Sequence, residues 1–416
     1  MSELYEIKEE TERVILVGVS TSEQDDTSAS LDELKELADT AGAVCVGRMI
    51  QNRESVHPGT YLGKGKIDEL ALLIDETQAT GVICDDELSP AQLKNLEDAL
   101  QTKIMDRTLV ILDIFAAHAS TSEGKIQVEL AQLKYRSSRL IGLRSALSRL
   151  GGGIGTRGPG EKKLEMDRRL IKDRITQLNK ELANVKNHRE VLRQQRSKSL
   201  LPVVSIVGYT NAGKSTLLNR LTDAGVLEED KLFATLDPTT RSLTLPDGQE
   251  VLLTDTVGFI RKLPHHLIDA FRSTLEEARY ADILLHVVDA SNPQMDTQMY
   301  VVYETLKQLD IGDKPIITLF NKQDKLTEQV ILRDFQADKT LSISAKTGEG
   351  LSALLEQLEE ILRNQKVYIS CVYPYDSAGK IQLIRKNGQL LKEEYTADGI
   401  LVEAYVPQEL YHTVLP

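Results

Sequence analysis

One octapeptide restricts the possible folds of this chain more than any other stretch, namely GYTNAGKS at residues 208–215. It lies between the apolar run PVVSIVG, which predicts a buried strand, and STLLNRLTDAG, which predicts a helix. It fits the pattern G-x-x-x-x-G-K-[ST], in which glycines let backbone N–H groups surround phosphates. Lys214 would then reach the outer phosphate oxygens, and the Ser215 hydroxyl would bind Mg²⁺. We therefore predict a phosphate-binding α/β domain built around a parallel sheet.

Four further motifs follow this loop in an informative order. They are FATLDPTTR with Thr235, DTVG with Asp255, NKQD at 321–324 and SAK at 344–346. The Asp324 carboxylate can accept hydrogen bonds from both N1–H and N2–H of guanine, whereas adenine has no N2 amine. ATP should therefore be rejected, since it would leave a carboxylate unpaired. Asn321 and Lys322 would brace the loop and cover the base, and the Ala345 backbone would meet the guanine oxygen.

The motifs together predict a Ras-like GTPase domain with GTP as substrate. Mg²⁺ would be held by Ser215, Thr235 and Asp255, although Thr239 and Thr240 are alternatives to Thr235 because spacing alone does not align this loop. The candidate catalytic residues are Lys214, Thr235, Gly258 and Asn211. The residues that we expect to contact the nucleotide are Gly208, Tyr209, Thr210, Asn211, Ala212, Gly213, Lys214, Ser215, Thr216, Phe233, Ala234, Thr235, Leu236, Asp237, Asp255, Thr256, Val257, Gly258, Asn321, Lys322, Gln323, Asp324, Ser344, Ala345 and Lys346.

Changes of pattern along the 416 residues divide the chain into four domains. Residues 1–125 alternate apolar runs with helical patterns, which favours a small parallel α/β domain. Residues 126–197 read as two long amphipathic helices joined by GGGIGTRGPG, which predicts a helical hairpin with a glycine-rich tip. The GTPase domain follows at 198–363, and 364–416 predict a small α+β domain with strands around one short helix. The overall fold class is α/β.

Positive charge is concentrated in the hairpin. The chain has a net charge of −13, but residues 134–198 hold 18 Lys and Arg against 6 Asp and Glu, a local charge of +12. Such segregation favours an RNA or phosphate partner, with a solvated helix face as the alternative. The expected phosphate contacts are Arg144, Arg149, Arg157, Lys162 and Lys163.

Two other glycine-rich stretches are weaker signals. GIGTRG at 153–158 matches a dinucleotide fingerprint, but it follows a helix rather than a strand, so we reject that interpretation. HPGTYLGKGK at 57–66 lacks the spacing of a phosphate loop, and a simple strand-to-helix turn is an equally good interpretation.

The cysteines and the apolar runs bear on location. Cys45, Cys84 and Cys371 are far apart and lack metal-ligand spacing, which favours a reducing cytosol. The chain begins with the acidic stretch MSELYEIKEE, and no run reaches about 18 apolar residues, so the sequence predicts neither secretion nor a membrane span. We expect a cytoplasmic monomer.

Taken together, these motifs resemble the HflX family of bacterial GTPases over about residues 13–363. The resemblance is carried by HPGTYLGKGK, GGGIGTRGPGEKKLEMDRR, GYTNAGKSTLLNRL, FATLDPTTR and DTVGFIRKLPHHLIDAFRSTLEEAR, together with the stretch that begins at DRTLVILDIF. It implies a translation factor that binds the 50S ribosomal subunit and separates 70S ribosomes under stress, with the hairpin on 23S rRNA. It also implies an ATP-dependent activity on RNA in the N-terminal domain, but no complete ATP motif is visible there.

Phe259 stands directly after DTVG, where Ras-like GTPases hold the glutamine that orients the attacking water. We therefore expect slow intrinsic hydrolysis. K⁺ is a candidate cofactor, because Asn211 resembles the potassium-binding asparagine of some relatives, and the ribosome could order the loops instead. The alternatives are a regulatory GTPase whose hairpin docks on a protein, and rRNA remodelling driven by ATP.

Overall fold

In the computed structural model the chain divides into two compact units. The first unit comprises residues 1–186, 229–237 and 260–273, and the second comprises 187–228, 238–259 and 274–416. The structure describes residues 11–22, 26–150, 159–196, 201–222, 232–233, 238–262, 277–311, 313–327 and 331–415. None of the helices within these ranges combines the length and the apolar character needed to cross a bilayer.

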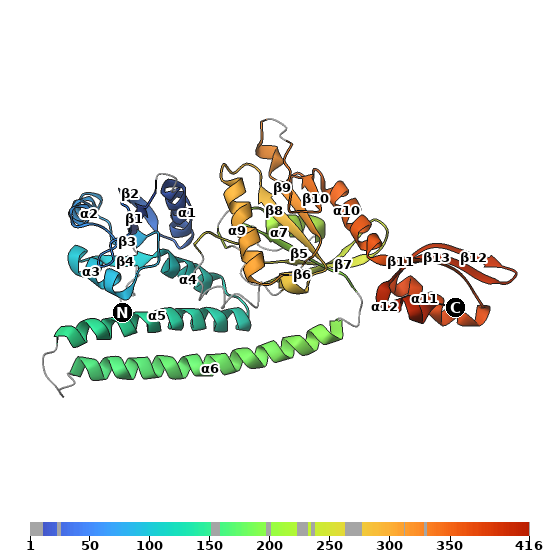
Figure 1. Ribbon diagram of the computed structural model, residues 1–416, viewed down its shortest axis with the longest axis horizontal. Helices are drawn as coiled ribbons and strands as arrows, with labels where there is room; N and C mark the ends of the chain where they lie inside the picture. The colour runs from blue at the N-terminus through green and yellow to red at the C-terminus, as the bar shows by residue number, and fades with distance from the viewer. Residues whose placement is uncertain are drawn as a thin grey trace, which may run out of the picture. The chain divides into compact units, whose positions relative to one another are not determined.

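The first unit is built on a parallel sheet in the order β2-β1-β3-β4. Its strands are short and largely apolar, and helices follow each of them (Figure 1). The elements are β1 Arg13–Ser20, α1 Thr27–Thr40, β2 Val44–Asn52, α2 Lys64–Thr77, β3 Gly81–Cys84, α3 Pro90–Leu100, β4 Lys103–Asp106 and α4 Arg107–His118. The strand order reverses between β1 and β3, and in open parallel sheets the crevice at the carboxyl ends of such strands is the usual ligand position.

A capping box begins α3, as the sequence Ser89-Pro90 suggests. The Ser89 hydroxyl accepts from the Gln92 backbone N–H at 3.2 Å, and the Gln92 side chain accepts from the Ser89 N–H at 2.9 Å. The cap satisfies two backbone donors that the helix itself cannot pair.

The hairpin consists of α5, Ser122–Leu150, and α6, Pro159–Arg196, which run antiparallel side by side (Figure 1). Tyr135 and Arg139 of α5 both bond to the buried carboxylate of Asp106, at 2.6 Å and 2.5 Å. Arg174 of α6 makes a two-pronged ion pair with Glu129 of α5, at 2.7 and 2.8 Å. Side-chain contacts therefore fasten α5 to the sheet and α6 to α5.

The second unit contains a six-stranded sheet in the order β10-β9-β8-β5-β7-β6. All neighbouring strands are parallel except β6 and β7, which pair antiparallel. The elements are β5 Val203–Gly208, α7 Lys214–Thr222, β6 Thr239–Thr244, β7 Glu250–Asp255, β8 Ile283–Asp289, α9 Met295–Gln308, β9 Ile316–Asn321, η2 Gln323–Lys325, β10 Lys339–Ser342 and α10 Leu351–Asn364.

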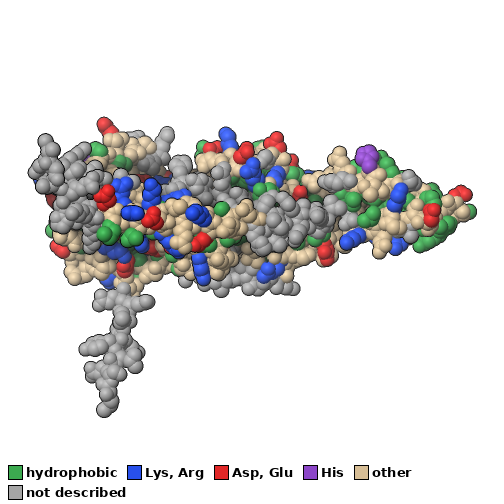
Figure 2. Space-filling view, turned by 90° about the horizontal axis from the view of Figure 1, so that it is seen from below, with side chains coloured by type: hydrophobic (Ala, Val, Ile, Leu, Met, Phe, Trp, Pro, Cys, Tyr) green, Lys and Arg blue, Asp and Glu red, His purple; other side chains and the backbone are tan. Residues whose placement is uncertain are grey.

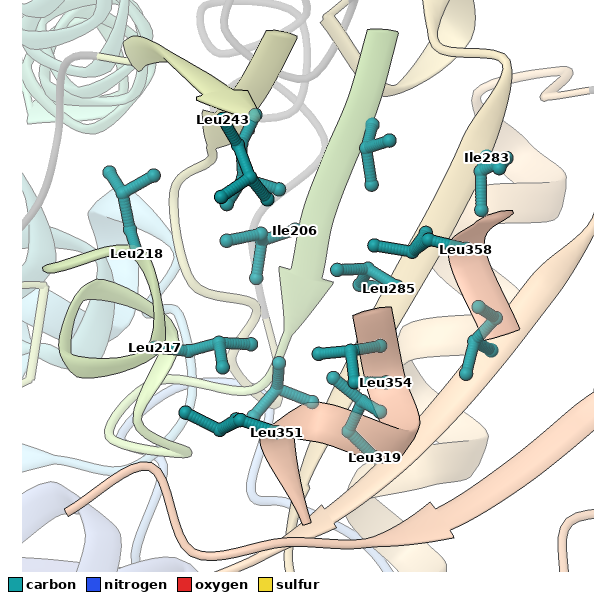
Figure 3. Close-up of a cluster of buried hydrophobic side chains, with 14 of the residues drawn as sticks. Ile206, Leu217, Leu218, Leu243, Ile283, Leu285, Leu319, Leu351, Leu354 and Leu358 are labelled. Carbon is teal, nitrogen blue, oxygen red and sulfur yellow. The ribbon is translucent and has the colours of Figure 1, made fainter. Parts of the chain in front are cut away.

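Apolar side chains from α7, α10 and the central strands form the core of this sheet (Figure 3). Ile206, Leu285 and Leu319 come from neighbouring strands, and Leu354 and Leu358 of α10 pack on them; each is 0% exposed. This packing holds the carboxyl ends of β5, β9 and β10 in fixed relation, which matters because the predicted nucleotide motifs follow these strands.

The closing segment folds as an antiparallel sheet in the order β11-β13-β12 with helices on one face. The elements are β11 Lys366–Tyr373, η3 Tyr375–Ser377, α11 Ala378–Asn387, β12 Gln389–Thr396, β13 Gly399–Pro407 and α12 Gln408–Val414. Exposed hydrophobic side chains, including Tyr368, Val372 and Leu391, gather over this domain (Figure 2, right). The predicted fold class, an α/β chain with a helical hairpin and a small α+β domain, is confirmed, although α12 was not foreseen.

Candidate nucleotide site

The predicted phosphate loop connects β5 to α7, as the motif requires. Gly208 has φ +152° and Gly213 has φ +98°, both outside the range that L side chains readily adopt. A Cβ on Gly208 would lie 2.2 Å from the Val287 carbonyl oxygen, and one on Gly213 would lie 2.3 Å from Asn321 Nδ2. Only glycine fits these two positions, so the spacing of the motif follows from the packing of neighbouring strands against the loop.

Lys214 is buried in the loop that it closes. Its ammonium donates to the Tyr209 carbonyl oxygen at 2.8 Å. Burial lowers the pKa of Lys214 to about 8, Asp255 opposes that shift, and Lys322 adds to it. A buried cation of this kind is stabilised by a bound anion, and phosphate is the anion that this loop geometry accommodates.

Two oxygen ligands for a hard cation meet beside this loop. The Ser215 hydroxyl donates to Asp255 Oδ2 at 2.8 Å, and Asp255 itself is fully buried at the end of β7. Hydroxyl and carboxylate oxygens are suitable Mg²⁺ ligands, so these residues fit that ion. Among the described residues no three His, Cys, Asp or Glu side chains converge, and an ion here would need phosphate oxygens as well.

The DTVG segment lies directly on the phosphate loop. The Thr256 hydroxyl donates to the Ile206 carbonyl at 2.7 Å, which holds the segment on β5. Phe259 then forms two backbone hydrogen bonds with the loop: its N–H donates to Gly208 O at 3.1 Å, and its C=O accepts from Thr210 N at 2.8 Å. The Phe259 side chain is 2% exposed, so the residue in the place of a catalytic glutamine is buried.

The predicted base-recognition loops converge on the phosphate loop through Asn321, at the end of β9. Its amide nitrogen donates to Ala212 O at 2.8 Å, and its oxygen accepts from the Ala345 N–H at 2.9 Å. Lys322 donates to Asn211 O at 2.7 Å. The bracing role expected of Asn321 and Lys322 thus has a geometric basis, whereas the Ala345 N–H that we expected to meet guanine bonds to Asn321 in this structure.

Asp324 lies where its carboxylate can be reached by a ligand. The Ser344 hydroxyl donates to it at 2.6 Å, and this bond, with smaller contributions from the charges of Lys346 and Lys325, holds the pKa of Asp324 below its usual range. An ionised carboxylate accepts hydrogen bonds and cannot donate them, which suits the two donors on the edge of guanine. Gln323 donates to Phe320 O at 3.1 Å.

Several residues predicted to contact the nucleotide or Mg²⁺ are not seen at the phosphate loop within the described parts of the chain. Ala234, Thr235, Leu236 and Asp237 lie outside the described residues. The alternative Thr240 lies on β6, where its hydroxyl pairs with that of Thr254 at 2.9 Å. Phe233 belongs to the first unit, where its ring makes an edge contact with Phe115 at 4.6 Å between centroids.

Four of the five residues that we expect to contact RNA lie on the two described helices of the hairpin. Arg144 and Arg149 lie on α5, and Lys162 and Lys163 lie on α6, while Arg157 is outside the described residues. Of the other cations in 134–198, Arg139 and Arg174 bind acidic groups of the same unit. These two contribute to the fold, Arg139 as a mostly buried cation and Arg174 through an ion pair in which it stays 41% exposed.

The second glycine-lysine stretch forms a turn that is held by hydrogen bonds within it and by bonds to Asp86 and Asn95. His57 Nδ1 lies 2.8 Å from the Thr60 hydroxyl and accepts from the Thr60 N–H at 3.1 Å, and the Tyr61 hydroxyl donates to Asp86 at 2.7 Å. Asn95 donates to Gly59 O at 2.7 Å. These bonds favour the interpretation of HPGTYLGKGK as a turn that connects β2 to α2.

Sequence reasoning missed Asp289, which ends β8 and pairs with Lys322 at 2.7 Å. An aspartate at the end of an apolar strand beside the phosphate loop was the available signal. It also missed the ion pairs of Lys262 with Asp85 and Asp86, for which a single sequence carries no signal.

The comparisons with known proteins concern the domain that holds this site and the chain as a whole. Residues 203–322 match the family described as 50S ribosome-binding GTPase, and 28–116 and 118–196 match the N-terminal and middle regions of GTP-binding GTPases. A protein of Lacrimispora saccharolytica named GTPase HflX is 72% identical over 99% of this chain and 97% of its own. The protein of that name from Caldanaerobacter subterraneus is 51% identical over 98% of this chain and 94% of its own. Among solved structures, the SsGBP and GDP complex is 25% identical with a TM-score of 0.47, covering 84% of this chain and 98% of its own.

Proposed function

The chain belongs to the HflX family of GTPases, and from that premise we propose that it is a ribosome-associated factor that binds the 50S subunit and separates 70S ribosomes under stress in the cytoplasm. It binds GTP and hydrolyses it to GDP and phosphate. The matched GTPase family is described as 50S ribosome-binding, which supports the choice of partner. The observation that carries the proposal is the local charge of +12 over residues 134–198 in a chain whose net charge is −13.

The geometry of the described residues supports the roles that we propose for the phosphate loop and the base-recognition loops. Backbone N–H groups of the phosphate loop and the Lys214 ammonium would hold the phosphates. Ser215 and Asp255, together with Thr235, would hold Mg²⁺, which when bound neutralises charge on the outer phosphates. Asp324 would select guanine, while Asn321 and Lys322 keep the loops together. Arg144, Arg149, Arg157, Lys162 and Lys163 would contact 23S rRNA phosphates.

Buried Phe259 cannot orient water, so the chain's own groups leave the hydrolytic step incomplete. We propose that engagement of the 50S subunit supplies the main acceleration by ordering the loops around the phosphates. K⁺ beside Asn211 would add a smaller contribution by neutralising charge. Asn211 has φ +59° and its carbonyl oxygen accepts a hydrogen bond from Lys322, so the backbone of the loop is held in place at this residue.

The test is steady-state GTP turnover with and without 50S subunits, each in K⁺ and in Na⁺. We expect slow turnover for the protein alone, a stimulation of at least about tenfold by 50S subunits, and a smaller increase in K⁺ than that from the ribosome. Isolated 30S subunits serve as the matched control and should not stimulate. Turnover that is already fast in the protein alone in Na⁺ would contradict both sources of help.

A further inference from the structure

An aspartate ends the central strand β8 beside the nucleotide loops of the second unit. In the register of β8 and β9, Asp289 lies opposite Asn321, and the Ala290 N–H donates to the Asn321 carbonyl oxygen at 3.0 Å. The carboxyl ends of these two parallel strands therefore meet at one edge of the sheet. This register brings the side chain of Asp289 next to the residue that follows Asn321, which is Lys322.

Each oxygen of the Asp289 carboxylate has a partner. Oδ1 accepts from the Ser291 N–H at 3.0 Å and from the Ser291 hydroxyl at 2.6 Å, which forms the turn that ends β8. Oδ2 pairs with the Lys322 ammonium at 2.7 Å. The turn thus fixes the orientation of the carboxylate, and its second oxygen faces Lys322.

The same ammonium also holds the phosphate loop. Lys322 donates to the Asn211 carbonyl oxygen at 2.7 Å, so it connects the end of β8 to the loop after β5. The side chain of Lys322 is 16% exposed and that of Asp289 is 14% exposed. An ion pair at this depth is screened less than a surface pair, and the loss of one partner costs more. Asp289 therefore contributes to the position of Lys322 on the loop.

Lys322 lies close enough to Lys214 for the two charges to interact. Burial is the main reason that the pKa of Lys214 is lowered, and the charge of Lys322 lowers that pKa further. Two neighbouring cations repel one another, and the Asp289 carboxylate offsets one of these charges. Without the carboxylate, the flexible side chain of Lys322 would turn toward solvent. Nucleotide binding would then have to order this side chain again, at an entropic cost.

We propose that Asp289 is a positioning residue for guanine nucleotides: by holding the Lys322 ammonium against the phosphate loop, it sets how long GDP and GTP stay bound. The inference rests on the role proposed above for Lys322 and identifies the carboxylate on which that role depends. The effect is similar for GDP and GTP, because Lys322 belongs to the loop that we expect at the base, which the two nucleotides share.

The test measures the rates at which fluorescent derivatives of GDP and of a non-hydrolysable GTP analogue dissociate from the full chain with Mg²⁺. In Asp289→Asn the amide oxygen can still accept from Ser291 and keep the turn, while the amide nitrogen, a donor, faces the Lys322 ammonium. We expect both nucleotides to dissociate about tenfold faster from this variant, a loss between those of exposed and buried ion pairs. The single-turnover rate of hydrolysis of bound GTP should stay within about twofold of the wild type, because binding common to ground state and transition state does not alter that rate.

Glu360→Gln is the matched control, because it makes the same chemical change in an exposed pair with Lys339 of the same unit, and it should leave both dissociation rates unchanged. Lys322→Met should also accelerate dissociation. Adding Asp289→Asn to Lys322→Met should produce no further acceleration, since the two residues act through one contact. An aspartate that only stabilised the turn would accelerate dissociation by the same factor with and without Lys322, and that result would overturn the proposal.

Dissociation from Asp289→Asn at the wild-type rate overturns the proposal as well. Lys322→Met then distinguishes two failures. If Lys322→Met accelerates dissociation, the role of Lys322 stands and the inference about Asp289 fails alone; if it does not, the role proposed for Lys322 fails too. Because these measurements involve no ribosomes, either result leaves the ribosomal proposal standing.

Discussion

The choice of base rests on a single carboxylate. Asp324 accepts from Ser344 and is otherwise open to a ligand, and its lowered pKa keeps it ionised across the neutral range. Two donors on one edge of guanine match such an acceptor, and each hydrogen bond to a charged group contributes about 1.5–3 kcal/mol. Asp324 can therefore account for a large part of the preference for guanine over adenine.

Asp324→Asn should weaken GDP binding by about 100-fold, because the amide presents a donor to a base edge that also donates. Xanthine has a carbonyl in place of the N2 amine, so xanthosine diphosphate should bind this variant better than GDP does. Calorimetry with GDP and with xanthosine diphosphate, on the wild type and on Asp324→Asn, measures this reversal of base preference. Unaltered preference for GDP in the variant would show that base selection lies elsewhere.

Single residues differ in how far the sequence predicts them. Asp324 was predictable because its tetrapeptide follows an apolar strand and precedes SAK at a plausible distance. Lys262 was not, because its partners are 177 and 176 residues away and only the fold brings them together. Phe259 stands out in the sequence as an exception to a pattern, but its burial and its two backbone hydrogen bonds to the phosphate loop depend on the three-dimensional fold.

At the scale of elements, the loop after β9 holds the nucleotide site together. Asn321 connects it to the phosphate loop after β5 and to the loop after β10, and its side chain is 2% exposed. The contacts of Asn321 are to backbone groups, so it fixes the relative positions of three strand ends without depending on which base is bound.

Asn321→Ala should lower the affinities for GDP and for the GTP analogue by a similar factor of about 10 to 100, since it removes two hydrogen bonds that hold the loops together, at a net value of about 0.5–1.5 kcal/mol each. Guanine should still be preferred over xanthine. Gln323→Ala, two positions along the same loop, removes one partly exposed bond to Phe320 and is the matched control. A change of base preference without loss of affinity would assign Asn321 a recognition role instead.

Apolar runs predicted most elements but not all of them. The runs at EVLLTD, DILLHVVDA and PIITLFNK correspond to strands β7, β8 and β9, because buried parallel strands are apolar on both faces. Strand β4 carries little signal in the sequence, because it has only four residues, KIMD, and passes into α4 without a loop, since Asp106 also caps that helix. The antiparallel pairing of β6 depends on its neighbour in the sheet, which its own residues do not specify.

At the scale of the whole molecule, positive charge is concentrated in the helical hairpin and negative charge in the rest of the chain. Lys and Arg exceed Asp and Glu by 12 over residues 134–198, and the remainder of the chain is acidic. A basic helical hairpin that neutralises RNA phosphates releases counterions, so its affinity falls steeply as the salt concentration rises. The affinity of a hairpin that docks on an apolar protein surface would depend little on salt.

Replacing Arg144, Arg149, Lys162 and Lys163 together by Gln should weaken cosedimentation with 50S subunits and reduce the slope of log affinity against log salt by roughly one per lost phosphate contact. Binding is measured at several ionic strengths with Mg²⁺ held constant. The matched control replaces the exposed residues Lys64, Lys103, Lys307 and Lys339 by Gln. A slope that falls equally in both variants would favour a general charge effect, and an unchanged slope would favour a protein partner.

Helix α6 is long enough that small rotations of it have large effects at its far end. It runs for 38 residues, so that at 1.5 Å per residue it is about 57 Å long. A rotation of such a helix by about 10° about one end moves the other end by about 10 Å, a distance greater than the rise of one helical turn. Angular changes too slight to disturb the packing at one end of the helix are thereby amplified into displacements of several ångströms at the other end.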